Sequence, residues 1–270
     1  MAPLDSPVPQ PGTQGQRDLL PVSVAFADYD RTRPLVDGRV KPAGIALKTT
    51  TQWVGEFCTR PVYEEFDAAE MSLSWYIAAR DRGEPCIALP VFPLRDPMWA
   101  YMYTRTDSPI TDPSQLRGRR VGMQGYRFTI YLWLRGLLKD YYNLPPEEVT
   151  WCTSEAELNG YVFPPGIRVE KVEGKSSVEK LRDGEVDAIW APRVPKPFQD
   201  REPWIRRLFP DAQGEFQRFH QKTGLLPFSH CVVMSEKLAK REPWVAKSLD
   251  RKSTRLNSSH TDISRMPSSA

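Results

Sequence analysis

The stretch Val121–Tyr142, VGMQGYRFTIYLWLRGLLKDYY, decides the fold that the sequence predicts. A short apolar run, Val121–Met123, is typical of the end of a strand, and a glycine-containing turn follows it. From Thr129 onward the apolar residues recur with the period of a helix, and Arg135 and Lys139 fall off their face. That apolar face consists of Ile130, Leu134, Leu137, Leu138 and Tyr141. The stretch therefore predicts a strand, a tight turn and an amphipathic helix in succession.

A helix that begins directly after a strand and a glycine turn can bind an anion such as a carboxylate. Its first backbone N–H groups have no partner within the helix and point toward whatever lies above the strand end. Thr129 can cap this helix or donate its hydroxyl to a ligand. Because units of this kind are common, an ordinary unit with nothing bound remains the alternative from these residues alone.

Short strands and helices alternate along the rest of the chain, which predicts an α/β architecture. The loop at 193–198 is predicted to follow a strand, and Ser235 is predicted to cap the last helix. Strands or extended apolar segments are expected at 21–27, 45–49, 68–73, 87–92, 100–104, 149–152, 186–190, 205–208 and 229–234. Helices are expected at 55–66, 74–83, 113–117, 177–182 and 215–223, in addition to the one that starts at Thr129.

Polar side chains at the strand ends are the candidate site, because open α/β sheets bind ligands at the carboxyl ends of their strands. Arginine binds a carboxylate through two parallel hydrogen bonds, so this set suits a small carboxylated and hydroxylated ligand. For each arginine taken singly, a solvated surface charge is the alternative. The candidate residues are Arg31, Arg33, Ser72, Ser74, Arg95, Tyr126, Thr129, Arg193 and His230.

The C-terminal residues 250–270 are expected to be an artefact. The block DRKSTRLNSSH is the conceptual translation of a widely used sequencing adapter, and SRMPSSA matches a later portion of the same adapter. A polar, serine-rich disordered tail is the alternative. These residues carry four basic and two acidic side chains, so excluding them lowers the formal net charge from +3 to +1. We expect the native sequence to differ after about Leu249.

The composition excludes several classes of function. There is no basic excess that would indicate a nucleic-acid partner. The cysteines Cys58, Cys86, Cys152 and Cys231 lack the spacing of metal ligands and are expected to be reduced thiols, and no metal site is predicted. Residues 1–19 are expected to be a flexible leader without a secretory signal, and no segment is long enough to span a bilayer. We therefore expect a cytoplasmic protein that is not bound to a membrane.

Seven blocks of the sequence, in matching order, resemble the 4,5-dihydroxyphthalate decarboxylase family, which is similar in fold to type II periplasmic binding proteins. The resemblance runs from about Val22 to Leu249. The chain departs from the family pattern at Leu94 and at Arg127, which adds a positive charge where members carry a neutral amide. The blocks are YDRTRPLVDGRV, MSLSWY, VFPLR, GYRFTIYLWLRGLL, GEVDAIWAPRVP, RLFPDAQGEF and KTGLLPFSH.

The resemblance implies two α/β lobes with a central cleft. Lobe one would comprise residues 20–107 and 225–249, and lobe two would comprise residues 108–224. The chain would cross near Ser108 and return near Leu225. The oligomeric state is left open by the sequence.

The resemblance also implies the non-oxidative decarboxylation of a hydroxylated aromatic carboxylate in aromatic catabolism. Such a reaction needs an acid near the ring carbon that loses its carboxylate and a site that desolvates that carboxylate. The ring hydroxyls push the electrons, so no cofactor is required in principle. His230 is the best acid, because histidine titrates near neutrality, although a structural histidine bonded to the backbone is an equal alternative.

A solute-binding protein that closes on a small organic anion without chemistry is the second hypothesis. Binding proteins of this fold usually work outside the cytoplasmic membrane, so the expected lack of a signal favours the enzyme. An interaction domain is a third hypothesis with little support. Fold alone does not decide between them.

Overall fold

The structure is a computed structural model that describes residues 19–58, 61–95, 98–155 and 161–258, with Val54, Cys58 and residues 251–258 described by their backbone alone. Nearly all of the predicted leader and residues 259–270 of the predicted artefactual tail lie outside this part. Within the described part, the chain forms two compact units. Unit 1 contains the chain up to Leu94 and from His230 onward, and unit 2 is Arg95–Ser229.

These boundaries differ from the crossings expected near Ser108 and Leu225. The strand β5, Met102–Arg105, explains the first difference, because it pairs antiparallel with β9 (Ala188–Trp190) and β10 (Ile205–Arg207). Hydrogen bonding thus places β5 in the sheet of unit 2. The second crossing falls directly before β11, which pairs within unit 1.

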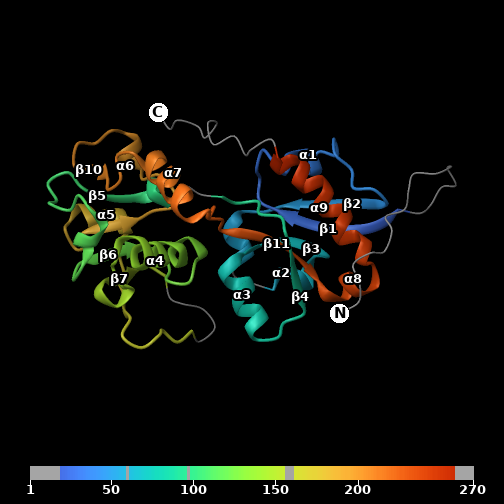
Figure 1. Ribbon diagram of the computed structural model, residues 1–270, viewed down its shortest axis with the longest axis horizontal. Helices are drawn as coiled ribbons and strands as arrows, with labels where there is room; N and C mark the ends of the chain where they lie inside the picture. Colours follow the sequence, from blue (N-terminus) through green and yellow to red (C-terminus); the bar gives the residue numbers. More distant parts are fainter. Residues whose placement is uncertain (1–18, 59–60, 96–97, 156–160, 259–270) are drawn as a thin grey trace. The chain divides into compact units, whose positions relative to one another are not determined.

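Unit 1 is built on a five-stranded sheet with the order β2-β1-β3-β11-β4. The strands β1, β2 and β3 are mutually parallel, and β11 is antiparallel to both of its neighbours. In Figure 1 the orange β11 lies within the blue and cyan strands, where the chain returns to this unit. The strands are β1 (Leu20–Phe26), β2 (Ile45–Thr51), β3 (Ala68–Ser72), β4 (Cys86–Leu89) and β11 (His230–Ser235).

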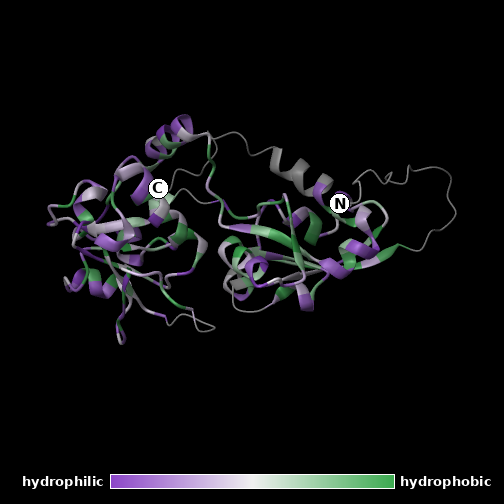
Figure 2. Ribbon diagram, turned by 60° about the horizontal axis from the view of Figure 1, so that its bottom comes forward, coloured by the Kyte–Doolittle hydropathy of each residue, from purple (hydrophilic) through white to green (hydrophobic). Residues whose placement is uncertain are grey.

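Apolar residues of one sheet face and of two C-terminal helices form the core of unit 1. Val24, Phe26 and Val232 pack in one buried cluster with Val245 and Leu249 of α9. In the hydropathy view of Figure 2, strands of unit 1 contain green apolar segments, as expected for burial of apolar surface. The helical elements of the unit are α1 (Arg33–Val36), η1 (Val54–Cys58), α2 (Val62–Glu65), α3 (Leu73–Asp81), α8 (Glu236–Arg241) and α9 (Pro243–Ser258).

Unit 2 is built on a six-stranded sheet with the order β10-β5-β9-β6-β7-β8. The strands β6, β7, β8 and β9 are parallel, and β5 is inserted antiparallel to its neighbours. The strands not yet given are β6 (Arg120–Met123), β7 (Thr150–Thr153) and β8 (Arg168–Lys171). Its helical elements are η2 (Met98–Tyr101), η3 (Pro113–Leu116), α4 (Thr129–Tyr142), η4 (Pro146–Glu148), α5 (Ser177–Arg182), α6 (Lys196–Gln199) and α7 (Ala212–Thr223).

Three local expectations were wrong. The helix predicted over 55–66 is divided into η1 and α2, and Pro61 takes the N-cap position of the second element. The loop expected at 193–198 contains α6, which begins with a proline in its first turn. The N-cap of α4 is Phe128 rather than Thr129, which is the first residue inside the helix. The prediction that Ser235 caps a helix is confirmed, because its Oγ accepts a hydrogen bond from Leu238 N at the start of α8, although α8 is followed by α9.

Among the described residues, no helix is both long enough and apolar enough to cross a bilayer.

Candidate functional site

A buried histidine–carboxylate pair lies at the carboxyl end of β3 in unit 1. His230 Nδ1 lies 2.6 Å from Glu70 Oε1, and their side chains are 7% and 0% exposed. An ionised carboxylate only accepts hydrogen bonds, so with Glu70 ionised the imidazole N–H at Nδ1 is the donor. The pair then forms a charge-assisted hydrogen bond in a buried environment, where such bonds are stronger than in water.

The pairing of β3 with β11 produces this contact. The two strands are antiparallel, with His230 opposite Ser72 and Val232 opposite Glu70. Because side chains alternate between the faces of a strand, these four residues share one face. The first residue of β11 thus meets the carboxyl end of β3, which is the ligand-binding edge of such a sheet.

Two further groups donate to the Glu70 carboxylate. The Ala27 backbone N–H donates to Oε2 at 2.9 Å, and the Tyr29 hydroxyl donates to Oε1 at 2.7 Å. Both donors belong to the loop that follows β1, the parallel neighbour of β3. A buried carboxylate is tolerated when its oxygens are satisfied by hydrogen bonds, and here both oxygens are.

The loop after β1 also fixes Arg31. Its Nε donates to the carbonyl of Pro93, and its guanidinium carbon lies 4.5 Å from the centre of the Tyr29 ring. Thr32, which is buried, donates its hydroxyl to the Ala27 carbonyl at 3.2 Å. Arg31, predicted from the sequence, is therefore connected through Tyr29 to the Glu70 carboxylate.

The other predicted residues of the loops around β3 differ in their placement. Ser72 is buried, and its hydroxyl lies 3.4 Å from that of Ser74. Arg33 is exposed and pairs with Asp28 at 3.1 Å, which raises the pKa of its guanidinium through the side-chain hydrogen bond. The pairing favours the surface-charge alternative for Arg33. Arg95 is exposed and is the first residue of unit 2.

In unit 2, the predicted strand–turn–helix unit is present and its turn is held from both sides. Gln124 N donates to the Tyr131 hydroxyl of α4 at 3.1 Å. The side-chain amide of Gln124 donates to Glu155 at 2.6 Å, and the Glu155 backbone N–H returns a bond to the Gln124 carbonyl at 2.9 Å. Thr129, at the first position of α4, is buried.

Tyr126 lies in a group of aromatic side chains and is 3% exposed. Its ring makes edge contacts with Trp151 and Phe163 at centroid distances of 6.5 and 5.3 Å. Arg135 stacks its guanidinium carbon 3.6 Å from the Tyr126 ring centre and donates to the Tyr126 carbonyl at 2.7 Å. Arg135 lies beside the apolar face of the helix, yet it is only 7% exposed because Tyr126 covers its guanidinium.

Arg127 and the candidate residue Arg193 are two further arginines of unit 2. Arg127 places its guanidinium carbon 4.8 Å from the Tyr161 ring, a distance at which a cation is attracted by the ring face. Arg193, which follows β9, is exposed. Among the described residues, no group of three histidine, cysteine or acidic side chains is arranged to hold a metal ion.

Sequence reasoning missed Glu70, Tyr29 and Arg135. Glu70 carried a signal, because it is the one charged residue in the otherwise apolar run 68–71, AAEM, of a predicted strand. A charge in a buried strand needs a partner, and that requirement indicates a functional or structural pair. Which residue would be the partner depends on the pairing of two strands that are distant in sequence.

Comparison with solved structures defines the class of fold. The chain is similar to the periplasmic sulfonate-binding protein SsuA from Methylobacillus flagellatus KT, with a TM-score of 0.58 over 89% of this chain and 68% of that chain, at 12% sequence identity. At this identity the likeness defines the fold alone. The two α/β units therefore have the fold of type II periplasmic binding proteins, as the sequence predicted.

Comparison with curated sequences defines the family. The chain is 32% identical to 4,5-dihydroxyphthalate decarboxylase of Comamonas testosteroni over 235 residues, which are 84% of this chain and 71% of that protein. It is 33% identical to the protein of the same name from Pseudomonas putida over 204 residues, which are 72% of this chain and 79% of that protein. No family model matches the chain. The chain belongs to the 4,5-dihydroxyphthalate decarboxylase family.

Proposed function

We propose that this chain catalyses the non-oxidative decarboxylation of a hydroxylated aromatic carboxylate similar to 4,5-dihydroxyphthalate, in the cytoplasm and as part of aromatic catabolism. The observation that carries the proposal is the buried pair of His230 and Glu70 at the carboxyl edge of the unit 1 sheet. The names of the two relatives support it. A histidine held in this way is suited to moving a proton, which the reaction requires.

In the proposed reaction, His230 gives a proton to the ring carbon that bears the departing carboxylate. A C–H bond forms as the N–H bond breaks, and the ring hydroxyls stabilise the resulting cation. The bond to the carboxylate then breaks, its electron pair restores the aromatic ring, and carbon dioxide leaves. One proton is consumed, and no electrons are gained or lost.

The other candidate residues bind the substrate in this proposal. Arg31 and Arg193 hold carboxylates, and Arg33 is the weakest of the predicted arginines because its guanidinium already pairs with Asp28. Tyr126 is a further residue assigned to the substrate in this proposal. The remaining polar contacts are assigned to Ser72, Ser74, Arg95 and Thr129.

An assay of carbon dioxide release from a panel of hydroxylated aromatic carboxylates tests the function. In deuterated water, the product should carry one deuterium at the carbon that lost its carboxylate, because the proton comes from an exchangeable group. A solute-binding protein would instead bind one of these anions and release no carbon dioxide. Binding without turnover would therefore contradict the proposal.

The histidine has a matched control in the same chain. His230→Ala should lower kcat by about a hundred- to ten-thousand-fold with little change in affinity, because a general acid acts only in the transition state. His220 lies on α7, where its Nδ1 is 3.0 Å from the Leu225 carbonyl, and His220→Ala should leave kcat unchanged. A His230→Ala protein with the wild-type rate would remove this histidine from the mechanism.

A further inference from the structure

We propose that Glu70 and Tyr29 are positioning residues, which fix the proton on Nδ1 of His230 and thereby assign proton delivery to Nε2. The inference rests on the proposed function, because it concerns the proton that His230 delivers. Neither residue was selected from the sequence, and both follow from contacts within unit 1.

The hydrogen bonds hold the Glu70 carboxylate in one orientation. Oε2 accepts from the Ala27 backbone N–H, and Oε1 accepts from both Tyr29 and His230. Rotation of the carboxylate would break bonds on both oxygens at once in a fully buried environment. Leaving a buried polar group unsatisfied is costly, so the carboxylate is in place before any substrate binds.

A fixed carboxylate determines which ring nitrogen carries the proton. A neutral imidazole has one N–H, and the Glu70 oxygen can only accept, so the N–H belongs to Nδ1. Nε2 is then the nitrogen from which a proton passes to the ring carbon. As Nε2 releases this proton, the bond between Nδ1 and Glu70 is retained, and the imidazole returns to its starting tautomer.

Tyr29 contributes by supporting the same carboxylate oxygen. Its ring is packed against the Arg31 guanidinium, and its backbone N–H donates to the Thr32 hydroxyl at 3.3 Å. Removing the Tyr29 hydroxyl would take one donor from Oε1 and leave the His230 bond intact. The effect of Tyr29 on catalysis should therefore be smaller than that of Glu70 and in the same direction.

The tautomer can be measured directly in the wild-type protein. The sequence contains three histidines, so the ring nitrogens of His230 can be assigned by long-range ¹H–¹⁵N NMR with His230→Ala as the reference. We expect a proton on Nδ1 of His230 at every pH at which the enzyme turns over. A neutral His230 ring that carries its proton on Nε2 would overturn the proposal.

The variants then separate positioning from binding. Glu70→Gln should lower kcat by about a hundredfold, within the range of general-acid effects, with KM changed by less than about threefold. Tyr29→Phe should lower kcat by about tenfold. The control is Tyr63→Phe, which removes a tyrosine–carboxylate bond to Glu84 elsewhere in unit 1 and should leave kcat unchanged.

The outcomes distinguish this inference from the proposed function. No turnover by the wild type would contradict the proposed function. Turnover by the wild type with a wild-type kcat in Glu70→Gln would contradict the inference alone. If Glu70→Gln fails to fold by circular dichroism, Tyr29→Phe and the wild-type NMR spectrum decide, and a kcat of Tyr29→Phe equal to that of Tyr63→Phe would contradict a role for Tyr29.

Discussion

The thiols of the described residues illustrate how burial controls single side chains. Cys86, Cys152 and Cys231 are all buried and reduced. Burial raises the pKa of each thiol, most for Cys231, whose pKa is raised to about 12 by burial and by the nearby Cys86 and Glu70. These thiols are therefore neutral in the folded protein and are not positioned as nucleophiles.

The raised pKa of Cys231 predicts a loss of stability at alkaline pH. The folded state keeps the thiol proton while the unfolded state releases it near pH 8.5, so the free energy of unfolding is unaffected well below that pH and falls as the pH rises toward about 12. The contribution is at most about 1.4 kcal/mol per pH unit. Urea unfolding measures the free energy of unfolding of the wild type and of Cys231→Ala. The two values should change in parallel from pH 7 to 8, and the value of the variant should decline less steeply from pH 9 to 10. Equal slopes over the whole range would contradict the pKa shift.

Two charged residues show what sequence periodicity cannot assign. Arg135 occupies a polar position beside the apolar face of α4, yet it is buried because the Tyr126 ring and carbonyl accept its guanidinium. Glu70 occupies a core position of β3, and its partners come from β11 and from the loop after β1. In both cases the partner is set by tertiary contacts, so a local pattern gives the wrong environment or none.

At the level of elements, the described strands other than β8 and the long helices were predictable from apolar periodicity. The helix α5 was predicted over Ser177–Arg182, and α4 from Thr129, as observed. Three short elements were missed: α1 and α6 are single turns, and β8 has low burial along its length. Isolated single turns have little intrinsic stability, so their sequences carry a weak signal.

Adjacent serines at the start of α5, the N-cap Ser176 and the first helical residue Ser177, allow a test of helix capping. Ser176 Oγ accepts from the Glu179 backbone N–H at 3.2 Å, and the Glu179 carboxylate accepts from Ser176 N, which together form a capping box. Ser176→Ala should lower the free energy of unfolding by about 1 kcal/mol. Ser177→Ala, one position inside the helix, should change it by less than about 0.5 kcal/mol. Urea unfolding of the two variants measures the difference, and equal losses would show that the cap does not stabilise α5.

At the scale of the whole molecule, the two units bring different chemistry to the carboxyl edges of their sheets. Unit 1 has a histidine held by a buried carboxylate, and unit 2 has aromatic rings and arginines in the segments after β6, β7 and β9. Because open α/β sheets bind ligands at the carboxyl ends of their strands, the sequence predicted candidate residues at this edge of both sheets, including His230, Tyr126 and Arg193. The prediction that the residues of the two units face one another across a cleft stays a prediction.

The proposed role of Arg193 predicts a difference between diacids and monoacids. A charge-assisted pair to a second carboxylate is worth roughly 1.5–3 kcal/mol, and tenfold in affinity corresponds to about 1.4 kcal/mol. Arg193→Ala should therefore weaken the binding of a phthalate-type diacid by about tenfold or more and that of the matching monoacid by much less. Calorimetric titration with the two ligands measures both affinities.

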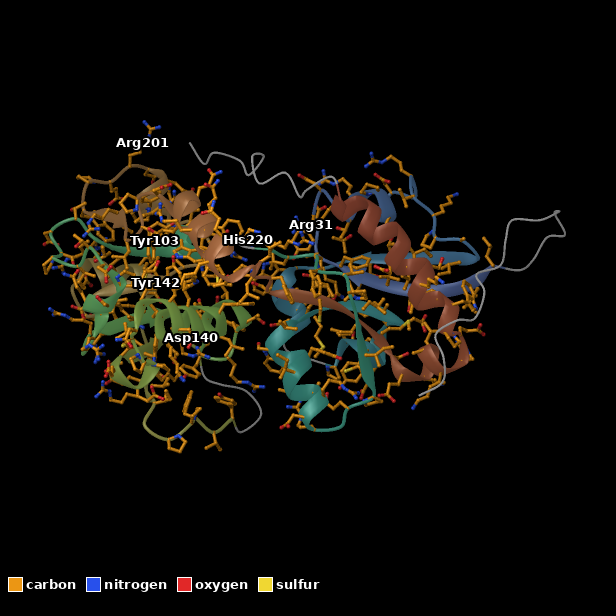
Figure 3. All side chains as sticks on the ribbon, viewed as in Figure 1. Arg31, Tyr103, Asp140, Tyr142, Arg201 and His220 are labelled. Carbon is orange, nitrogen blue, oxygen red and sulfur yellow. The ribbon has the colours of Figure 1, made fainter. Side chains whose placement is uncertain are left out.

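Arg201 provides the control for this charge. It lies after α6 in the same unit, is exposed, and extends away from the rest of the unit in Figure 3. Arg201→Ala removes the same net charge. Any loss of affinity that comes from the overall electrostatic field of unit 2 therefore appears equally in both variants. A loss specific to Arg193 and to the diacid indicates a direct carboxylate contact. An equal loss for monoacid and diacid in Arg193→Ala would instead assign this arginine to the general attraction of anions and leave the second carboxylate to another residue.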